Sequence, residues 1–215
     1  MSDKAQIYII DDHDVVRFGL SMLVNNHPAM QVVGSAASLQ VAQDDIRRLT
    51  PALVISDLTL QDSRGLDTVR AVVAAQCGRP TLFVSMHEED IYAEQALSLG
   101  ARGFLMKDRA QEHVVAAAQA ILGGNIWISQ KVSNLLLGRI AGNPPRRNEP
   151  AATVALSARE LEVLEKVGAG LTTKQIAFEL GISPRTIDIH RARIKHKLGI
   201  KSGSELIAYA VTHMK

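Results

Sequence analysis

The sequence predicts an α/β fold with a doubly wound five-stranded parallel sheet, followed by a second, all-α domain. Three observations predict it. Strand and helix signals alternate five times over residues 1–124, and the signals after about residue 157 are all helical. A stretch with three prolines, "AGNPPRRNEPAAT" (141–153), separates the two parts. The 215 residues are enough for one large domain or two small ones.

Five short apolar runs are the expected strands. Their continuous apolar character is typical of a parallel sheet that helices cover on both faces. They are "QIYII" (6–10), "QVVGSAA" (31–37), "ALVIS" (52–56), "TLFVS" (81–85) and "RGFLM" (102–106). Helical stretches follow them near 15–25, 39–49, 66–76, 90–99 and 111–122. Five such units in this length indicate a flavodoxin-like sheet over residues 1–124.

The rest of the chain is interpreted as a linker and a helical domain. We expect a linker over 125–152 with one short helix in "NIWISQKVSNLLLGRI", and an all-α domain over 153–215. The helical stretches of that domain lie near 157–167, 172–180, 184–198 and 203–213.

Helix starts in the last domain are marked by their spacing. Ser157 with Glu160 and Thr172 with Gln175 match the capping box. Ser183, followed by a proline, predicts a third start. Two short helices joined by "GIS" make a helix-turn-helix.

Charge is divided unevenly along the chain. Residues 1–124 hold 10 Lys+Arg against 15 Asp+Glu, whereas residues 151–215 hold 10 against 6. The acidic part suits cations and the basic part suits a polyanion. The two domains are therefore expected to have different partners.

Composition also bears on the compartment. Cys77 is the only cysteine, so no internal disulfide can form and a reducing compartment is expected. The start "MSDKAQIYII" lacks the pattern of a signal peptide, and no apolar run approaches the roughly 20 residues of a membrane helix. We expect a cytoplasmic protein without a membrane partner.

Side chains that can bind a metal or take part in group transfer lie at the ends of the predicted strands. Asp11 and Asp12 follow the first strand, Asp57 the third and Lys107 the fifth, and Ser85 ends the fourth. Ligands of open parallel sheets bind beyond the carboxyl ends of the strands, so we expect these side chains to converge. Mg²⁺ suits two or three converging carboxylates. A lysine and a hydroxyl opposite them complete a phosphoryl-transfer site with Asp57 as nucleophile.

Each of these residues alone has a simpler interpretation. An Asp at a strand end is most often a turn former or a helix cap, and Asp14 is expected to cap the helix that follows. A lone lysine is most often a solvated surface charge. His13 is most simply a loop residue at the rim. The joint occurrence at four strand ends favours the functional interpretation.

Four stretches, "YIIDDHDVVRFGL", "VISDLTL", "LFVSMH" and "ARGFLMKD", resemble the receiver domain of bacterial two-component response regulators. The resemblance covers the whole first domain. It implies that Asp57 accepts a phosphoryl group from a histidine of a sensor kinase. It also implies that Asp11, Asp12, Asp57 and the backbone carbonyl of Thr59 bind Mg²⁺.

The same resemblance implies that Lys107 pairs with phosphoryl oxygens, that Ser85 is the switch hydroxyl and that Phe104 is the coupled aromatic. The loop "DLTLQDSRG" has Leu60 and Gln61 where the family usually has Met-Pro, and without the ring we expect a more flexible loop. Met86 is bulkier than the residue often found there and is expected to restrict access to the phosphoryl group. An influence of His87 on hydrolysis stays open.

The third helix of the last domain has a distinct outward face. At about 100° per residue, Ile187, Ile194 and Leu198 form the inward stripe. The outward residues are Arg185, Ile189, Ala192 and His196, flanked by Asp188, Arg193 and Lys195. A solvated charged face explains the cations but not an exposed Ile189 and Ala192 at their centre. An apolar centre among cations suits a major groove.

The stretch "LSARELEVLEKVGAGLTTKQIAFELGISPRTIDIHRARIKHKLGI" resembles the LuxR-type helix-turn-helix, and the whole chain resembles the NarL/FixJ group of response regulators. The resemblance implies base contacts through Asp188, Ile189 and Ala192 and a phosphate contact through Lys174. The last helix, "GSELIAYAVTH", matches the one through which DNA-bound domains pair, so a homodimer on DNA is expected.

The sequence thus predicts a transcription regulator controlled by phosphorylation, and not an enzyme. Two alternatives stay open. A Mg²⁺-dependent phosphohydrolase would use Asp57 as a covalent nucleophile, but such enzymes commonly need a general acid two residues on, where this chain has Thr59. The other is a DNA-binding scaffold that is independent of phosphorylation and whose first domain only dimerises.

Overall fold

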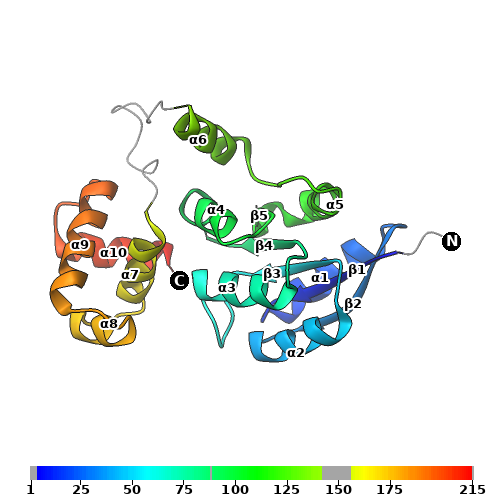
Figure 1. Cartoon of the computed structure of the whole chain (residues 1–215), viewed down its shortest axis with the longest axis horizontal. Helices are drawn as coiled ribbons and strands as arrows, with labels where there is room; N and C mark the ends of the chain where they lie inside the picture. The colour runs from blue at the N-terminus through cyan, green and yellow to red at the C-terminus, as the bar shows by residue number, and fades with distance from the viewer. Residues whose placement is uncertain (1–3, 88, 142–155, 215) are drawn as a thin grey trace. The chain divides into compact units, whose positions relative to one another are not determined.

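In the computed structural model, residues 4–87, 89–141 and 156–214 are described. The chain divides into two compact units, Met1–Gln130 and Lys131–Lys215 (Figure 1). The first unit thus runs past residue 124, where the sequence places the end of the first domain. Most of the proline-containing part of the expected linker lies outside the described residues.

The first unit is built on a five-stranded parallel sheet with the order β2-β1-β3-β4-β5. The strands are β1 (Ala5–Ile10), β2 (Met30–Ala36), β3 (Leu53–Asp57), β4 (Thr81–Ser85) and β5 (Gly103–Met106). All five predicted strands are present, and their order is the flavodoxin-like one. The order reverses beside β1 and β3, and ligands of such folds bind beyond the carboxyl ends of the strands there.

Helices cover both faces of this sheet (Figure 1). They are α1 (Asp14–Asn25), α2 (Leu39–Leu49), α3 (Gly65–Gln76), α4 (Glu89–Ser98) and α5 (Ala110–Leu122). α1 packs against α5, whereas α3 packs against α2 and α4. Ile7 and Ile9 of β1 belong to the apolar core that includes α1 and α5. Tyr8, between them, points to the other face and donates a 2.7 Å hydrogen bond to Asp45 of α2.

The segment after α5 pairs with the edge of the sheet. The N–H of Phe104 in β5 donates to the carbonyl of Trp127 at 2.9 Å, and the N–H of Trp127 donates to the carbonyl of Arg102 at 3.0 Å. The Trp127 ring packs against the apolar core. This pairing is the reason that the first unit extends beyond α5.

One helix start differs from the expectation. α1 begins at Asp14, and the N-cap residue is His13, whose side chain makes no capping hydrogen bond. Asp14 instead pairs with Arg17 one turn later. A carboxylate in the first turn still interacts favourably with the helix dipole, so Asp14 stabilises the helix without capping it.

The second unit contains the predicted helices. They are α7 (Ala158–Gly168), α8 (Thr173–Glu179), α9 (Pro184–Leu198) and α10 (Gly203–His213), and α6 (Gln130–Ile140) precedes the segment that is not described. Both capping boxes are present, at Ser157 and Thr172, and Ser183 caps α9. α7 packs against α9 and α10. A Cβ at Gly168 would lie 2.7 Å from a backbone oxygen of α10, so only glycine permits this approach. None of the described helices has the length and apolar character of a membrane span.

Candidate functional site

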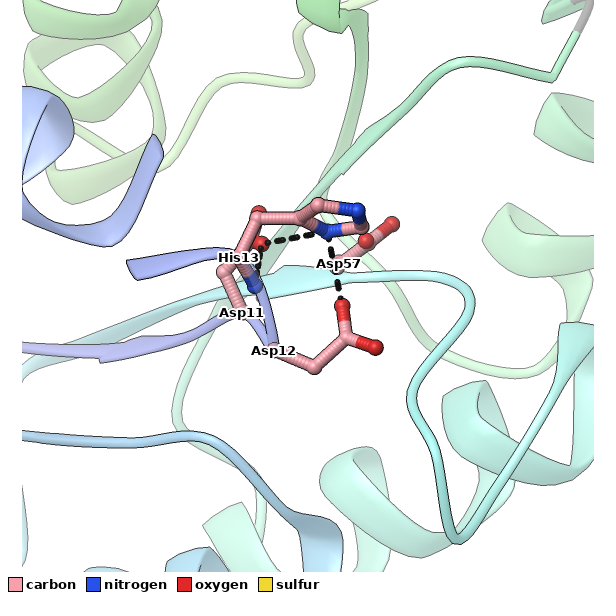
Figure 2. Close-up of side chains that lie close together, drawn as sticks. All are labelled: Asp11, Asp12, His13 and Asp57. Carbon is pink, nitrogen blue, oxygen red and sulfur yellow. Dashed lines mark hydrogen bonds and ion pairs between the residues drawn. The ribbon is translucent and has the colours of Figure 1, made fainter. Parts of the chain in front are cut away.

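Three carboxylates and a histidine meet beyond the carboxyl ends of β1 and β3 (Figure 2). One possible ligand atom from each of Asp11, Asp12, His13 and Asp57 lies within 4.8 Å of the other three. Asp11 and Asp57 are buried, whereas His13 is exposed. These side chains come together because β1 and β3 are neighbours in parallel register. The predicted convergence of Asp11, Asp12 and Asp57 is therefore present.

Lys107 joins two of the carboxylates. Its Nζ lies 2.7 Å from Oδ2 of Asp57 and 2.7 Å from Oδ2 of Asp11. The Lys107 side chain is only 9% exposed, so this is a largely buried ion pair rather than a surface contact. The lysine begins the 3-10 turn Lys107–Arg109 directly after β5, and so stands at the carboxyl edge of the sheet.

Burial and charge act in opposite directions in this cluster. For Asp57, burial is the largest influence and raises the pKa of the carboxyl above its ordinary 3.8, although Lys107 acts to lower it. For Lys107, burial alone would lower the pKa of the ammonium. Hydrogen bonds to Asp11 and Asp57 outweigh burial and raise that pKa above 10.5. The site therefore holds carboxylates that an additional cation would stabilise.

The donor atoms fit a hard divalent cation. Oδ2 of Asp11 and Oδ1 of Asp12 are buried, and among the described residues they face only Lys107 and His13, respectively. A buried carboxylate is costly unless it is paired, and each of its oxygens can take more than one partner. Three carboxylates that offer oxygen ligands match the preference of such a cation. The acidic cluster is thus a candidate metal centre.

A hydrogen-bonded chain connects the cluster to the end of β4. The N–H of Thr59 donates to Oδ1 of Asp57 at 3.2 Å, and Oγ1 of Thr59 lies 2.9 Å from Nε2 of His87. The N–H of His87 donates to Oγ of Ser85 at 3.0 Å. Ser85 and His87 are buried, whereas Met86 between them is 70% exposed. The Ser85 hydroxyl is thus held by the backbone two residues later.

Phe104 lies one strand further from the acidic cluster. It is 1% exposed and pairs with Phe83 across β4 and β5. Its main chain contacts Trp127, as described above. The expected coupled aromatic is therefore buried in this structure, and its main chain pairs with the segment that follows α5.

Two relationships in this site could not be read from the sequence. His13, interpreted as a rim residue, is exposed, and its Nδ1 also lies 2.8 Å from Oδ1 of Asp12. The bond between Thr59 and His87 joins residues 28 positions apart. A histidine two residues after a strand-end serine is the only sequence signal for it, and that signal does not name the partner.

The residues that the sequence places at the centre of the outward face of α9 are exposed. Ile187 and Ile194 are fully buried, whereas Ile189 is 46% exposed and Ala192 is exposed. A shallow apolar depression on this face is lined by Ile189, Ala192, Arg193, His196 and Lys197.

Charged residues surround this apolar centre. Arg185, Asp188, Arg193 and Lys174 are exposed, and Lys195 is partly exposed. Lys197 instead donates to Glu160 at 2.6 Å, which fixes α9 to α7. The result is an apolar centre with cations at its edges on one side of a helix, which is a candidate nucleic-acid interface.

Comparison with known families decides what these two units are. The response regulator receiver domain matches residues 7–119, and the luxR family of bacterial regulatory proteins matches residues 154–210. This chain belongs to the response-regulator family. This response regulator is 31% identical over 211 residues to the oxygen regulatory protein NreC of Staphylococcus carnosus, and the match covers 96% of each chain.

A second relative supports the assignment, and a solved structure shows the same fold. The response regulator is 32% identical over 200 residues to the transcriptional regulatory protein UhpA of Escherichia coli, which covers 93% of this chain and 94% of that one. It shares its fold with RcsB from Salmonella enterica serovar Typhimurium, solved bound to promoter rprA in the presence of phosphomimetic BeF3-. That match has a TM-score of 0.74 at 23% identity and covers 97% of this chain and 99% of that chain.

Proposed function

We propose that this response regulator accepts a phosphoryl group on Asp57 from a histidine of a sensor kinase and then regulates transcription as a dimer on double-stranded DNA. The observation that carries the proposal is the bridge from Lys107 to both Asp57 and Asp11 at the carboxyl edge of the sheet. The ammonium group of such a lysine can stabilise negative charge that develops at Asp57. UhpA, a transcriptional regulatory protein, supports the regulatory role.

In the proposed transfer, an oxygen of Asp57 attacks the phosphorus of a phosphohistidine. The phosphorus–nitrogen bond breaks, and its electron pair returns to the imidazole, which takes up a proton. Asp11, Asp12, Asp57 and the backbone carbonyl of Thr59 would hold Mg²⁺, which when bound offsets negative charge on the phosphoryl oxygens. Lys107 would pair with one of these oxygens.

The switch follows from the hydroxyl of Ser85. It accepts a hydrogen bond from the N–H of His87 in this structure. With a phosphoryl group on Asp57, this hydroxyl would donate to a phosphoryl oxygen instead, and Phe104 would repack beside it. A ligand shifts a two-state element only by differential contacts, and the phosphoryl group supplies such a contact.

In the second unit, we propose that α9 lies in the major groove. Asp188, Ile189 and Ala192 would meet base edges. Phosphates would be contacted by the cations at the edges, Lys174, Arg185, Arg193 and Lys195. We propose 1–124 as the receiver domain, 125–152 as the linker and 153–215 as the DNA-binding domain. A regulator of this kind acts on the chromosome and is not an enzyme, so we place it in the cytoplasm.

The test is phosphorylation by a small acyl phosphate with Mg²⁺, followed by mass spectrometry of the intact chain. We expect one phosphoryl addition, absent from Asp57→Asn and absent in EDTA. Asp44→Asn, which changes an exposed carboxylate of α2, serves as the matched control and should behave as the wild type. Labelling of Asp57→Asn would overturn the assignment. Rapid turnover of a phosphomonoester would instead favour a phosphohydrolase.

A further inference from the structure

We propose that Asp62 is a positioning residue for the phosphoacceptor site, because its carboxylate ties the loop between β3 and α3 to the start of α2. Oδ1 of Asp62 accepts a hydrogen bond from the N–H of Leu39 at 2.9 Å. Oδ2 accepts one from the N–H of Gln40 at 3.0 Å. Both oxygens of one carboxylate therefore hold the first two residues of a helix that precedes it by more than twenty positions.

The start of α2 offers backbone N–H groups that the carboxylate of Asp62 can bind. The first N–H groups of a helix have no partner inside the helix. Oγ of Ser38, the N-cap residue of α2, accepts from the N–H of Val41, whereas the N–H groups of Leu39 and Gln40 bond to Asp62. A carboxylate there also interacts favourably with the helix dipole. Burial acts to raise the pKa of Asp62, but backbone hydrogen bonds from Leu39, Gln40 and Asp62 itself outweigh it and lower that pKa.

The anchored loop is a closed turn that carries part of the proposed metal site. The N–H of Leu60 donates to the carbonyl of Ser63 at 2.7 Å, and the N–H of Gly65 donates to the carbonyl of Leu58 at 2.9 Å. These two bonds close the loop on itself. At its start, the N–H of Thr59 donates to Asp57. Holding the tip at Asp62 therefore also restricts the position of the Thr59 main chain.

The hydrogen bonds of Asp62 hold a loop that lacks the proline usual at this place. The chain has Gln61 in place of the proline that is usual in this loop. A proline restrains a loop through its own ring. Here the restraint comes from a contact with α2, which packs against α3 on the same face of the sheet (Figure 1). The loop is thus tied down by tertiary contact rather than by local chemistry.

This inference rests on the proposed function, because Asp62 would act on Mg²⁺ binding only through the loop. In the described part of the chain, Asp62 bonds to Leu39 and Gln40 and not to Asp57, so its loss should not remove the nucleophile. We expect a looser loop to bind Mg²⁺ less tightly and to leave the rate at saturating Mg²⁺ unchanged.

The experiment uses the full chain and three variants. Asp62→Ala removes both bonds, and Asp62→Asn keeps an oxygen that can accept one of them. Asp44→Ala removes an exposed carboxylate of α2, one that pairs with Arg47 on the same helix, and is the matched control. Hydrogen exchange of residues 39–40 and 58–65 is measured without metal. The Mg²⁺ concentration that gives half-maximal phosphorylation by acyl phosphate is then measured for each protein.

For Asp62→Ala we expect faster exchange at residues 39–40 and 58–65. We expect about a fivefold higher half-saturating Mg²⁺ concentration, the size of effect that a lost helix cap has on an equilibrium. The maximal rate should stay the same, Asp62→Asn should lie between, and Asp44→Ala should match the wild type. Wild-type exchange and Mg²⁺ dependence in Asp62→Ala would overturn the inference, as would an equal change in Asp44→Ala. If the wild type itself accepts no phosphoryl group, the proposed function fails. Hydrogen exchange at residues 39–40 and 58–65 then tests by itself whether Asp62 holds the loop.

Discussion

Nζ of Lys107 donates a 2.7 Å hydrogen bond to Oδ2 of Asp57, and the same nitrogen lies 2.7 Å from Oδ2 of Asp11. The lysine thus stands between two buried carboxylates that a metal ion would also use. Its ammonium offsets their repulsion in the absence of metal, and it competes with a cation for the same oxygens. Two consequences follow for the first unit.

Lys107→Met should destabilise the first unit in metal-free buffer. Removal of one partner of a buried ion pair leaves uncompensated charge and costs about 3–5 kcal/mol. We expect this loss at pH 7, and a larger stabilisation by Mg²⁺ in the variant than in the wild type, because the lysine no longer competes. Trp127, the only tryptophan, packs in the first unit, so urea unfolding followed by its fluorescence reports on that unit. Equal stabilisation by Mg²⁺ in both proteins would contradict the competition.

The second unit should lose stability in acid through Glu160. Burial acts to raise the pKa of this carboxyl, but hydrogen bonds from Lys197 and from the N–H of Ser157 outweigh it and hold that pKa below 4.5. A carboxyl whose pKa is lower in the folded than in the unfolded chain contributes stability above its ordinary pKa, and this stability is lost as the pH falls through the folded pKa. The free energy of unfolding should therefore decrease as the pH drops below 4.5.

Glu160→Gln tests this assignment in the fragment 131–215. The substitution should cost about 1.5–3 kcal/mol at pH 7, as for a hydrogen bond to a charged group, and should remove part of the dependence below pH 4.5. Urea unfolding followed by circular dichroism at several pH values measures both. Glu179→Gln changes the more exposed pair with Lys166 and should cost less than about 1 kcal/mol. The same acid dependence in Glu160→Gln and the wild type would assign the effect to another group.

Substitution of a cation and of an apolar residue on the DNA-binding face should change DNA binding in different ways. Lys174 is exposed at the start of α8, so Lys174→Ala should weaken binding to all DNA sequences alike and lower the salt slope by roughly 1. Ile189 lies at the apolar centre of α9, so Ile189→Ala should change the preference among operators by roughly 1–3 kcal/mol. Selection of binding sites from random DNA at two salt concentrations separates the two effects. Similar behaviour of both variants would show that this face of α9 is wrongly assigned.

Phosphorylation should control DNA binding by releasing the basic domain. The first part of the chain is acidic and the last part is basic, and a tether keeps such partners at high effective concentration. We expect the unphosphorylated receiver to cover part of α9 or α10, and a differential stabilisation of a few kcal/mol is enough to reverse this. The fragment 151–215 should bind operator DNA without phosphorylation, and the full chain should bind more tightly after acyl-phosphate treatment.

Sedimentation should show more dimer after the same treatment. Asp57→Asn is the control and should stay at the level of the untreated protein. If phosphorylated protein, unphosphorylated protein and fragment bind the operator equally, the covering contact does not exist. The receiver would then act only as a scaffold.

Most of the fold could be predicted because its signals are local. A continuous apolar run predicts a buried parallel strand, and all five such runs are strands. A capping box joins residues three positions apart, so Ser157 and Thr172 could be assigned before any packing was known. The prediction that Asp14 caps this helix was wrong, because an aspartate is favourable both as an N-cap and within the first turn beside the helix dipole.

The acidic cluster could be predicted for a different reason. Parallel strands end at one edge of a sheet, so residues that follow β1, β3 and β5 must lie near each other once the strands are known. Their register supplies the convergence of Asp11 and Asp57, and the position of Lys107 after β5 supplies the cation. The cluster therefore follows from the strand ends, and its prediction requires no knowledge of a particular long-range contact.

Local signals were enough to predict the two-part organisation, the sheet, the helix-turn-helix and the cluster of Asp11, Asp57 and Lys107. Packing, in contrast, set the bonds of Asp62 to the start of α2 and of Thr59 to His87. It also decided that Trp127 extends the sheet edge. The physical reason is the same in all three cases. Such bonds join residues whose distance depends on how whole helices, strands and loops pack, and no periodicity or spacing in the chain encodes the partner.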